Sequence, residues 1–271
     1  MQDQWVEFPH LSLAGRSLME GIVSTVETQL GSQLNPSYTP ADVRSFKNAD
    51  GSGEGSVNIK SGKEGSKVDF VLGSWLHCKL PFGALNIATI IGMVSHLTDT
   101  PHLLFEFIQS SPSSLVLVLD LLPRKDLVLE PEYLQWFYED TKLDIPRQTL
   151  EKAPEAQPYV SSSLYVRSVV SPTAILFKIS TESQGNEGTV DSMDKVVKDT
   201  VEPVVKEVVG IWLEAISTRG RSMQEHEQGL LLRRDNMIKT KGVEVDLSSN
   251  MPRLFGQDVA DRVVAAFRKG I

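Results

Sequence analysis

The sequence predicts an α/β protein: a three-layer α/β/α sandwich with a central, largely antiparallel sheet. Helical patterns stand at both ends of the chain, and strand patterns fill the middle. Two of these strands follow each other through a short turn, as in a hairpin. The strand over 115–122 is apolar at nearly every position, so both of its faces need cover. We interpret residues 1–271 as a single domain.

The chain begins with a helical pattern. Apolar residues recur every fourth position over 18–30 and form one helix face, which ends at Asn35-Pro36. The stretch 45–65 is polar, and residues 48–56 within it, rich in glycine and serine, predict a loop. Residues 68–80 begin with alternating apolar and polar residues, which predicts a strand. Residues 85–94 are apolar and rich in isoleucine, and periodicity leaves strand and helix open.

The middle of the chain predicts the hairpin. Residues 103–108 and 115–122 are strand patterns, and the serine-rich segment between them, with one proline, has the composition of a turn. Residues 131–140 carry four aromatic side chains and a proline at a helix-starting position, which predicts a short helical segment.

The rest of the chain is predicted to hold two strands and two helices. The polar stretch 146–158 is typical of a linker, and 163–170 and 174–179 read as two further strands. A loop is expected over 182–188. Apolar residues at helical spacing then predict a long amphipathic helix from Val190 to about residue 216, in which Pro203 can introduce a kink. A closing helix is predicted over 258–269.

Composition bounds the class of protein. Of the 271 residues, 41% are hydrophobic and 23% charged, which supports a sizeable core and argues against global disorder. No apolar run is long enough for a transmembrane segment. The single cysteine, Cys78, excludes an internal disulfide and a cysteine-held iron–sulfur cluster.

The net charge of −8 argues against nucleic acid as a partner, because phosphate neutralisation needs a basic face. The charge is uneven along the chain. Residues 219–271 carry 10 Lys and Arg against 7 Asp and Glu, a net of +3, whereas the first 218 residues carry −11. This C-terminal part is where we expect an anionic ligand or an acidic partner, unless it is simply a solvated helix surface.

Motifs for common cofactors are missing from the sequence. The glycine run Gly51–Gly55 lacks the preceding strand, the following helix and the lysine of a phosphate-binding loop, and no dinucleotide fingerprint occurs elsewhere. None of the five histidines is paired at a spacing suited to a metal. Cys78 and His77 are adjacent on a predicted strand and face opposite ways, so they are badly placed as a nucleophile and base.

Two carboxyl groups stand out in the strand patterns. Glu106 lies between Phe105 and Phe107 in an apolar strand, so it must be paired with a cation, hydrogen-bonded or protonated. Alternation places Glu106 on the opposite face from the two rings, where burial would favour a form able to donate a proton. Asp120 has a similar setting but precedes the turn predicted at Pro123, so we interpret it as a strand-end residue.

A cluster of three charged residues, Arg233-Arg234-Asp235, lies in the basic C-terminal part. Two arginines can hold ligand carboxylates through paired hydrogen bonds. The alternative interpretation is one turn of a surface helix.

Three segments give the chain a family resemblance. The run from Phe105 to Asp126 (FEFIQSSPSSLVLVLDLLPRKD) resembles red chlorophyll catabolite reductase of plants, a relative of the ferredoxin-dependent bilin reductases. The segments Tyr133–Asp140 (YLQWFYED) and Leu231–Asn236 (LLRRDN) resemble it as well. The likeness extends over nearly the whole chain, from the first helix to the last.

The resemblance implies a fold and an activity. The fold is an α/β/α sandwich with a central antiparallel sheet. The activity is reduction of a methine-bridge double bond of red chlorophyll catabolite, a linear tetrapyrrole, to the primary fluorescent catabolite of chlorophyll breakdown. Electrons come singly from reduced ferredoxin, and no organic cofactor or metal is tightly bound.

The resemblance also implies site residues. Glu106 is expected to be the main proton donor, and Asp235 a second donor or an orienting group. Substrate contacts are expected from Phe105, Phe107, Val170, Arg233 and Arg234, with Val170 or a neighbouring valine biasing which face of the substrate is protonated.

Partners and compartment follow from the same resemblance. Acidic ferredoxin would dock on a basic patch, for which Arg233, Arg234, Lys239, Lys241 and Arg253 are the candidates. The family works in chloroplasts, so the chain is expected to be a mature form whose transit peptide has been removed. Homodimers occur in the family.

Three other functions remain open from the sequence. The chain could reduce another bilin, such as biliverdin, or bind a tetrapyrrole without catalysis. A hydrolase that uses Glu106 and Asp120 as a carboxylate pair is disfavoured by their apolar strands.

Overall fold

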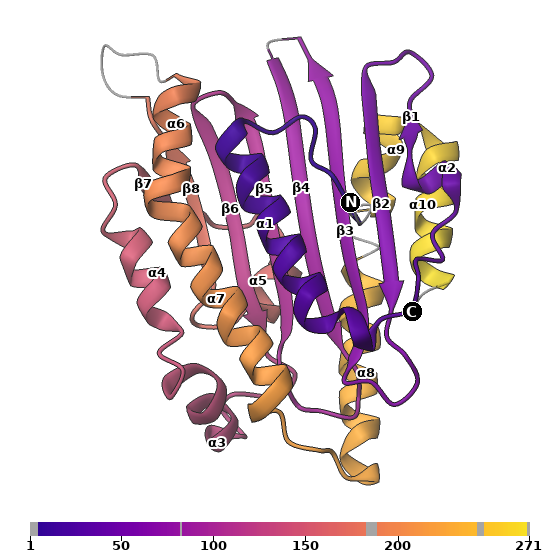
Figure 1. Ribbon diagram of the computed structural model, residues 1–271, viewed down its shortest axis with the longest axis vertical. Helices are drawn as coiled ribbons and strands as arrows, with labels where there is room; N and C mark the ends of the chain where they lie inside the picture. Colours follow the sequence, from indigo (N-terminus) through magenta and orange to yellow (C-terminus); the bar gives the residue numbers. More distant parts are fainter. Residues whose placement is uncertain (1–4, 82, 183–188, 243–246, 270–271) are drawn as a thin grey trace.

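The computed structural model describes residues 5–81, 83–182, 189–242 and 247–269. At its centre is an eight-stranded sheet in the order β1-β2-β3-β4-β5-β6-β8-β7, with every neighbouring pair antiparallel (Figure 1). The strands are β1 (Phe46–Lys47), β2 (Gly53–Ser61), β3 (Val68–Leu80), β4 (Gly83–Val94), β5 (His102–Ser111), β6 (Ser114–Leu122), β7 (Ala156–Pro158) and β8 (Ile175–Ser180).

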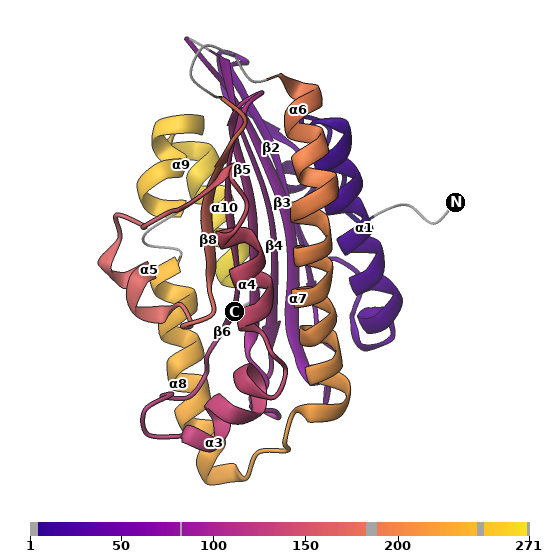
Figure 2. The same ribbon diagram turned by 90° about the vertical axis from the view of Figure 1, so that its left-hand side faces the viewer.

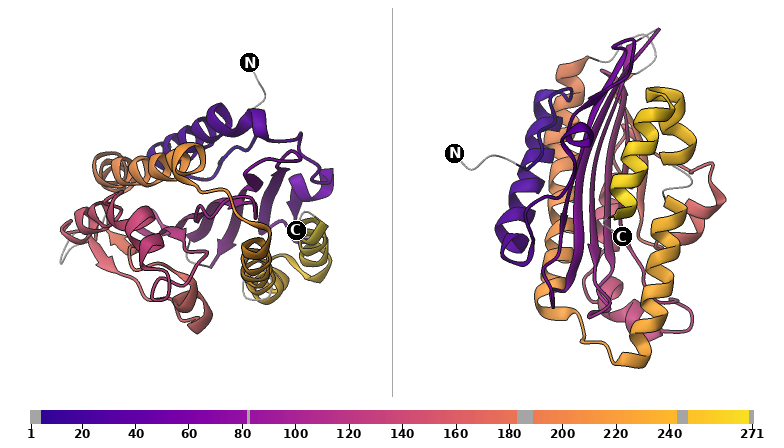
Figure 3. Two further views of the ribbon diagram at one scale, coloured as in Figure 1. Left: turned by 90° about the horizontal axis from the view of Figure 1, so that it is seen from below. Right: turned by 90° about the vertical axis from the view of Figure 1, so that its right-hand side faces the viewer.

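Helices cover both faces of this sheet. Figures 2 and 3 show α1, α6 and α7 on one face and α5, α8, α9 and α10 on the other. The predicted three-layer sandwich is therefore confirmed. The helices are α1 (Leu13–Leu30), α2 (Ala41–Arg44), α3 (Pro131–Leu134), α4 (Asp144–Glu151), α5 (Leu164–Val169), α6 (Val190–Val196), α7 (Glu202–Glu214), α8 (Glu225–Gly242), α9 (Ser248–Phe255) and α10 (Gln257–Lys269), with a 3₁₀ turn at Gly31–Gln33 and π turns at Gln135–Glu139, Val197–Val201 and Ala215–Arg219.

Two hydrophobic cores hold the layers together. The larger one packs α1 and α7 on the sheet and includes the fully buried Phe105, Phe107 and Trp212. The smaller one packs α9 and α10 on the edge of the sheet formed by β1–β3, and includes Phe70 and Phe255. The central part of the second face belongs to neither core, and the candidate site lies there.

Several predicted elements are confirmed. The first helix, the strand from Val68, the hairpin formed by β5 and β6, the short helical segment after Pro131 and the closing helix are all present. The segment 85–94, which the sequence left open, is the strand β4. Of the loop predicted over 182–188, residues 183–188 lie outside the described part of the chain.

The loop predicted over 48–56 is present only over 48–52, between β1 and β2, because β2 already begins at Gly53. Gly53 and Gly55 suggested a loop, but they are needed for close packing. A Cβ on Gly55 would lie 2.7 Å from the Phe46 ring and 2.8 Å from a Leu76 methyl carbon. The side chains that fill this space come from neighbouring strands, so sequence pattern alone does not reveal the strand.

The linker predicted over 146–158 is also wrong. It contains most of α4 and the short strand β7. Pro146 is the third residue of α4, where its missing N–H has no partner within the helix. The segment packs because Leu150 is fully buried in the larger core.

The strand predicted over 163–170 is a helix, α5, whereas its partner over 174–179 is confirmed as β8. Ser163 caps α5, accepting a hydrogen bond from the Val166 N–H at 3.3 Å. This cap competes with the strand propensity of the valines, and the backbone becomes extended again at Val170.

The long helix predicted from Val190 is present as α6 and α7 joined by the π turn Val197–Val201. The wide turn lies directly before Pro203, which has no N–H to continue the regular hydrogen-bond pattern.

Candidate functional site

Glu106 lies in β5, near the centre of the sheet. Alternation along the strand places its side chain on the face opposite α1 and α7, and Figure 2 shows α5 and α8 on that face. Its neighbours Phe105 and Phe107 point to the other face, where they are 0% and 1% exposed in the larger core. In register, Glu106 lies opposite Thr89 of β4 and Val118 of β6, so all three side chains share one face. The prediction that Glu106 and the two phenylalanine rings lie on opposite faces of the sheet is therefore confirmed.

The sheet around Glu106 is only partly covered. Strand residues of the same face remain half-buried there and belong to neither core, although they lie in the middle of the sheet. They are Ile87, Leu104, Ile108, Val116 and Leu176. A flat apolar surface with one carboxyl group among these side chains fits a flat, largely apolar ligand that needs a proton.

Asp235 takes part in a buried network instead. It lies on α8, is 4% exposed, and binds side chains from two other elements. Its Oδ1 is 2.9 Å from His102 Nε2 and 3.1 Å from Arg124 Nε, and its Oδ2 is 2.5 Å from the second guanidinium nitrogen of Arg124. Arg124 also donates to the carbonyls of Ser95, at 3.0 Å, and Thr98. The network ties α8 to β5 and to the segment after β6.

The hydrogen bonds of His102 define its tautomer. The backbone N–H of Val94 donates to His102 Nδ1 at 3.1 Å, so Nδ1 carries no proton and Nε2 donates to Asp235. Burial lowers the pKa of the ring against the opposing effect of Asp235. His102 is therefore neutral, and the charge that balances Asp235 is the guanidinium of Arg124.

The same contacts decide the protonation of Asp235. Burial alone would raise the pKa of this carboxyl, but the hydrogen bonds that it accepts from His102 and Arg124, together with the charge of Arg124, outweigh burial and lower the pKa below its usual range. Asp235 is thus an ionised hydrogen-bond acceptor near neutral pH. It is also distant from Glu106, because its partner His102 lies four residues along β5, about 13 Å. In this arrangement Asp235 can orient α8, and its role as a second proton donor stays a prediction.

The other expected substrate contacts lie in different surroundings. Phe105 and Phe107 are packed under α1 and α7, where the Phe107 ring would lie 3.2 Å from a Cβ on Gly15. Arg234 donates to the Pro123 carbonyl at 2.8 Å, and Arg233 is exposed. The two arginines lie on successive positions of α8 and do not form a clamp, since one faces the sheet side and the other faces solvent.

Val170 is half-buried at the end of α5, on the same side of the sheet as Glu106. It precedes a buried residue, Ser171, which no motif in the sequence marks as functional. The Ser171 N–H donates to Asp120 Oδ2 at 2.7 Å and its hydroxyl donates to Asp120 Oδ1 at 2.6 Å. Asp120 is 2% exposed, two residues before the end of β6. A carboxyl group in an apolar strand marks Asp120 in the sequence. Its partner Ser171 has no such mark, because it lies 51 residues away.

The expected basic patch is smaller than its five residues suggest. Lys239 is buried, with its Nζ 2.6 Å from Asp69 and 5.5 Å from the Phe70 ring centre. Arg234 is bound to the Pro123 carbonyl. Lys241 is half-buried. Arg233 on α8 and Arg253 on α9 remain exposed, and both helices lie on the same side of the sheet (Figure 3).

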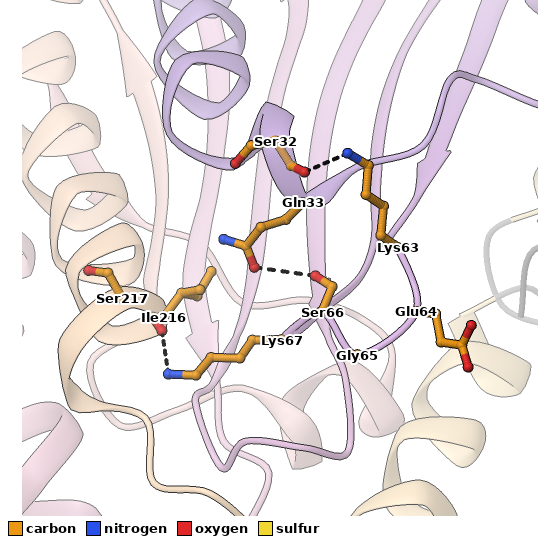
Figure 4. A pocket seen from close by; sticks show the side chains of 9 residues that line it. All are labelled: Ser32, Gln33, Lys63, Glu64, Gly65, Ser66, Lys67, Ile216 and Ser217. Carbon is orange, nitrogen blue, oxygen red and sulfur yellow. Dashed lines mark hydrogen bonds between the residues drawn. The ribbon is translucent and has the colours of Figure 1, made fainter.

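Two cavities in the molecule do not include the candidate residues. Figure 4 shows one of about 450 Å³ between the end of α1, the β2–β3 turn and the end of the α7 segment. Its lysines bind helix-end carbonyls: Lys63 Nζ is 2.7 Å from the Ser32 oxygen, and Lys67 Nζ is 2.9 Å from the Ile216 oxygen. The second cavity, of about 420 Å³, is lined by residues of α3, α4 and the segment before β8. We place the site on the Glu106 face because apolar side chains are left uncovered there.

Within the described ranges, no group of three or more His, Cys, Asp and Glu side chains is arranged to hold a metal ion. None of the helices in those ranges combines the length and the apolar character needed to cross a membrane.

Comparison with known proteins gives a consistent result. The family profile "Red chlorophyll catabolite reductase (RCC reductase)" matches residues 14–269. The chain is 45% identical to "Red chlorophyll catabolite reductase, chloroplastic" of Arabidopsis thaliana, over 99% of this chain and 84% of that protein. It is 43% identical to "Red chlorophyll catabolite reductase 1, chloroplastic" of Oryza sativa subsp. japonica, over 96% and 78%.

A barley relative and a solved structure extend the comparison. "Red chlorophyll catabolite reductase" of Hordeum vulgare is 46% identical over 74% of this chain and 97% of its own length. The fold is similar to that of tomato phytochromobilin synthase, solved in complex with biliverdin, with a TM-score of 0.70 and 16% identity over 93% of this chain and 82% of that one. The chain belongs to the red chlorophyll catabolite reductase family.

Proposed function

We propose that this chain is an oxidoreductase that reduces red chlorophyll catabolite, a linear tetrapyrrole, to the primary fluorescent catabolite. The observation that carries the proposal is the identity of 43–46% with three relatives of that name. The half-covered apolar face around Glu106 supports it, since this face offers a flat surface and one acid group. Two of the relatives are named chloroplastic, and the chain is assigned to the chloroplast.

The reaction needs two electrons and two protons. One molecule of substrate, two of reduced ferredoxin and two protons give one molecule of product and two of oxidised ferredoxin. Ferredoxin is the proposed donor because it supplies single electrons, and the chain has no motif for a nucleotide cofactor. The protein must therefore hold a proton donor at the methine bridge and limit water around the radical intermediate.

Glu106 is the proposed proton donor. Its position in the middle of the sheet fixes the backbone on both sides through β4 and β6. A proton passes from its carboxyl group to a carbon of the bridge, and solvent then restores it. Asp235 is the proposed orienting group: as an ionised carboxylate bound to Arg124 and His102, it sets the position of α8 over the site.

The test is an anaerobic assay of the purified chain with red chlorophyll catabolite, ferredoxin and a reducing system. The expected result is blue fluorescence of the product that requires both the chain and ferredoxin. A shifted pigment spectrum without fluorescence would instead indicate a tetrapyrrole carrier or a reductase of another bilin. The absence of both signals would contradict the proposal.

A further inference from the structure

The helix α5 is held to the molecule in an unusual way. It lies over the sheet on the Glu106 side, yet none of its residues is buried, and Leu164 is 74% exposed (Figure 2). Burial of apolar surface therefore contributes little to its position. The hydroxyl of Tyr165 donates to the Met237 carbonyl of α8 at 3.2 Å, but this contact is exposed to solvent.

The buried attachment of this segment is Ser171. Both of its donors bind the Asp120 carboxylate, at 2.6 and 2.7 Å, and both residues are almost completely buried. The Ser171 hydroxyl oxygen is also 2.9 Å from the Thr173 hydroxyl, and the Ser171 carbonyl accepts from the Ala174 N–H. Hydrogen bonds to an ionised carboxylate in a buried place are among the stronger polar contacts in proteins.

Asp120 lies close to the reacting face. In the register of β5 and β6, Asp120 is opposite Leu104 and Val118 is opposite Glu106, so Asp120 is a diagonal neighbour of Glu106 at about 7 Å on the same face. Ser171 is therefore anchored next to the proposed proton donor, and Val170 is one peptide bond away from that anchor.

We propose that Asp120 is a positioning residue: by holding Ser171, it fixes α5 and Val170 beside Glu106 and so orients the tetrapyrrole toward the Glu106 carboxyl group. The proposal rests on the proposed function. Asp120 itself exchanges no proton with the substrate in this scheme. Its effect passes through the segment 164–171, which forms one side of the half-covered face.

The consequence for catalysis is specific. If α5 is loosened, the substrate loses one wall and can present either face to Glu106. Protonation of a trigonal carbon from one face fixes its configuration, so a loosened wall mixes the two epimers of the product. Substrate affinity falls as well, because a mobile segment must be ordered on binding.

The first part of the test needs no substrate. Hydrogen exchange is measured over 164–171 in the whole protein and in three variants: Asp120→Asn, Ser171→Ala and the control Ser113→Ala. Ser113 is a matched control because its buried hydroxyl donates to the Glu182 carboxylate at 2.5 Å, at the other end of β6. Exchange over 164–171 is expected to rise at least tenfold in Ser171→Ala and Asp120→Asn, and to stay unchanged in Ser113→Ala.

The second part measures turnover and the product epimers. For Ser171→Ala we expect KM to rise about tenfold, kcat to change less than threefold, and the minor epimer to increase at least fivefold. Asp120→Asn should behave alike. Each of these two changes is also combined with Val170→Ala. In the combined variants, Ser171→Ala or Asp120→Asn should shift the epimer ratio less than it does in the otherwise unaltered chain, because both changes act through Val170.

The outcomes separate this proposal from the proposed function. Unchanged exchange over 164–171 in both variants would overturn the anchor, whatever the enzyme does. Increased exchange with unchanged KM and epimer ratio would overturn the positioning role. If the unaltered chain produces no fluorescent product, the proposed function fails, while the exchange experiment still decides the anchor. If Asp120→Asn does not fold, Ser171→Ala carries the same test.

Discussion

Three carboxyl groups lie on or above one face of the sheet, and their surroundings give them different roles. Glu106 is half-buried among apolar side chains that belong to neither core. Asp120 is buried against the two donors of Ser171. Asp235 is buried against the guanidinium of Arg124. The proposed roles of the three groups, an acid, an anchor and a fixed charge, follow from these different partners.

The first prediction concerns Glu106. Changing it to Gln preserves the shape of the side chain and removes the acid, so turnover should fall by about 10²- to 10⁴-fold. Pigment binding should change by less than threefold, which absorbance titration can measure. The matched control is Glu132→Gln, an exposed carboxylate on α3. Turnover of Glu106→Gln within about threefold of the unaltered enzyme would exclude the proton-donor role.

The second prediction concerns the charge of Asp235. Because its carboxylate balances the buried Arg124, Asp235→Ala should lower the free energy of unfolding at pH 7 by about 3–5 kcal/mol. The pKa of Asp235 is lowered from 3.8, so the part of this contribution that depends on the ionised carboxylate is present above pH about 4 and is lost as the pH falls below it. Urea unfolding at pH 7 measures it. The double variant Asp235→Leu, Arg124→Met is the control, and it should be more stable than Asp235→Ala.

The third prediction concerns Asp120, whose pKa is shifted in the opposite direction to that of Asp235. Burial raises its pKa from 3.8 to about 6, so the folded chain holds this proton more tightly than the unfolded chain. The stability gained from the protonated form is therefore complete below pH about 4 and lost as the pH rises through about 6. Asn cannot titrate. The unfolding free energy of the unaltered chain minus that of Asp120→Asn should fall by about 3 kcal/mol between pH 3.5 and 7. A difference that is constant with pH would show that Asp120 does not titrate in this range.

At the scale of elements, long periodic segments were predictable and short ones were not. The first helix, the hairpin and the helix from Val190 bury several residues at one spacing, so their own sequences define them. In contrast, β2 depends on glycines that make room for Phe46, and α5 depends on a cap and on an anchor from a distant strand. Contacts made across the fold decide such short elements.

The same limit applies to the candidate site. Glu106 could be selected from one strand, because a carboxyl group between two core aromatic residues is unusual in itself. The pairing of His102 with Asp235 joins residues 133 positions apart, and that of Asp120 with Ser171 joins residues 51 apart. Neither pair has a sequence signature. For this reason the partners of Asp235 could not be predicted from the sequence.

The fourth prediction tests the contact between α7 and the sheet. A Cβ on Gly92 of β4 would lie 2.3 Å from the Trp212 ring, so Gly92→Ala should lower the free energy of unfolding by about 1–3 kcal/mol. The control is Gly210→Ala on α7, where an added Cβ meets nothing within 4 Å. That change should raise stability by up to about 1 kcal/mol. Thermal unfolding followed by circular dichroism measures both, and equal effects would contradict the close packing.

At the scale of the whole molecule, the distribution of charge between the two helical layers affects where an electron donor can bind. The chain carries −8 overall, so an acidic donor such as ferredoxin is repelled by most of its surface. The exposed cations Arg233 and Arg253 lie on the layer that also covers the Glu106 face (Figure 3). An electron delivered on this layer enters near the substrate, whereas one delivered on the α1–α7 layer would have to cross a packed core.

The fifth prediction follows from this arrangement. Arg233→Glu should raise the KM for ferredoxin about tenfold and leave pigment binding unchanged, because Arg233 is an exposed residue of α8. Increasing salt from 50 to 300 mM should weaken ferredoxin-dependent turnover of the unaltered chain more than that of the variant, since the variant has lost a screened attraction. The matched control is Lys198→Glu, the same charge reversal at an exposed lysine in the opposite layer. Both reversals change the net charge by −2, so an equal rise in KM would assign the effect to total charge, and only a larger effect at Arg233 supports docking on the layer that covers Glu106.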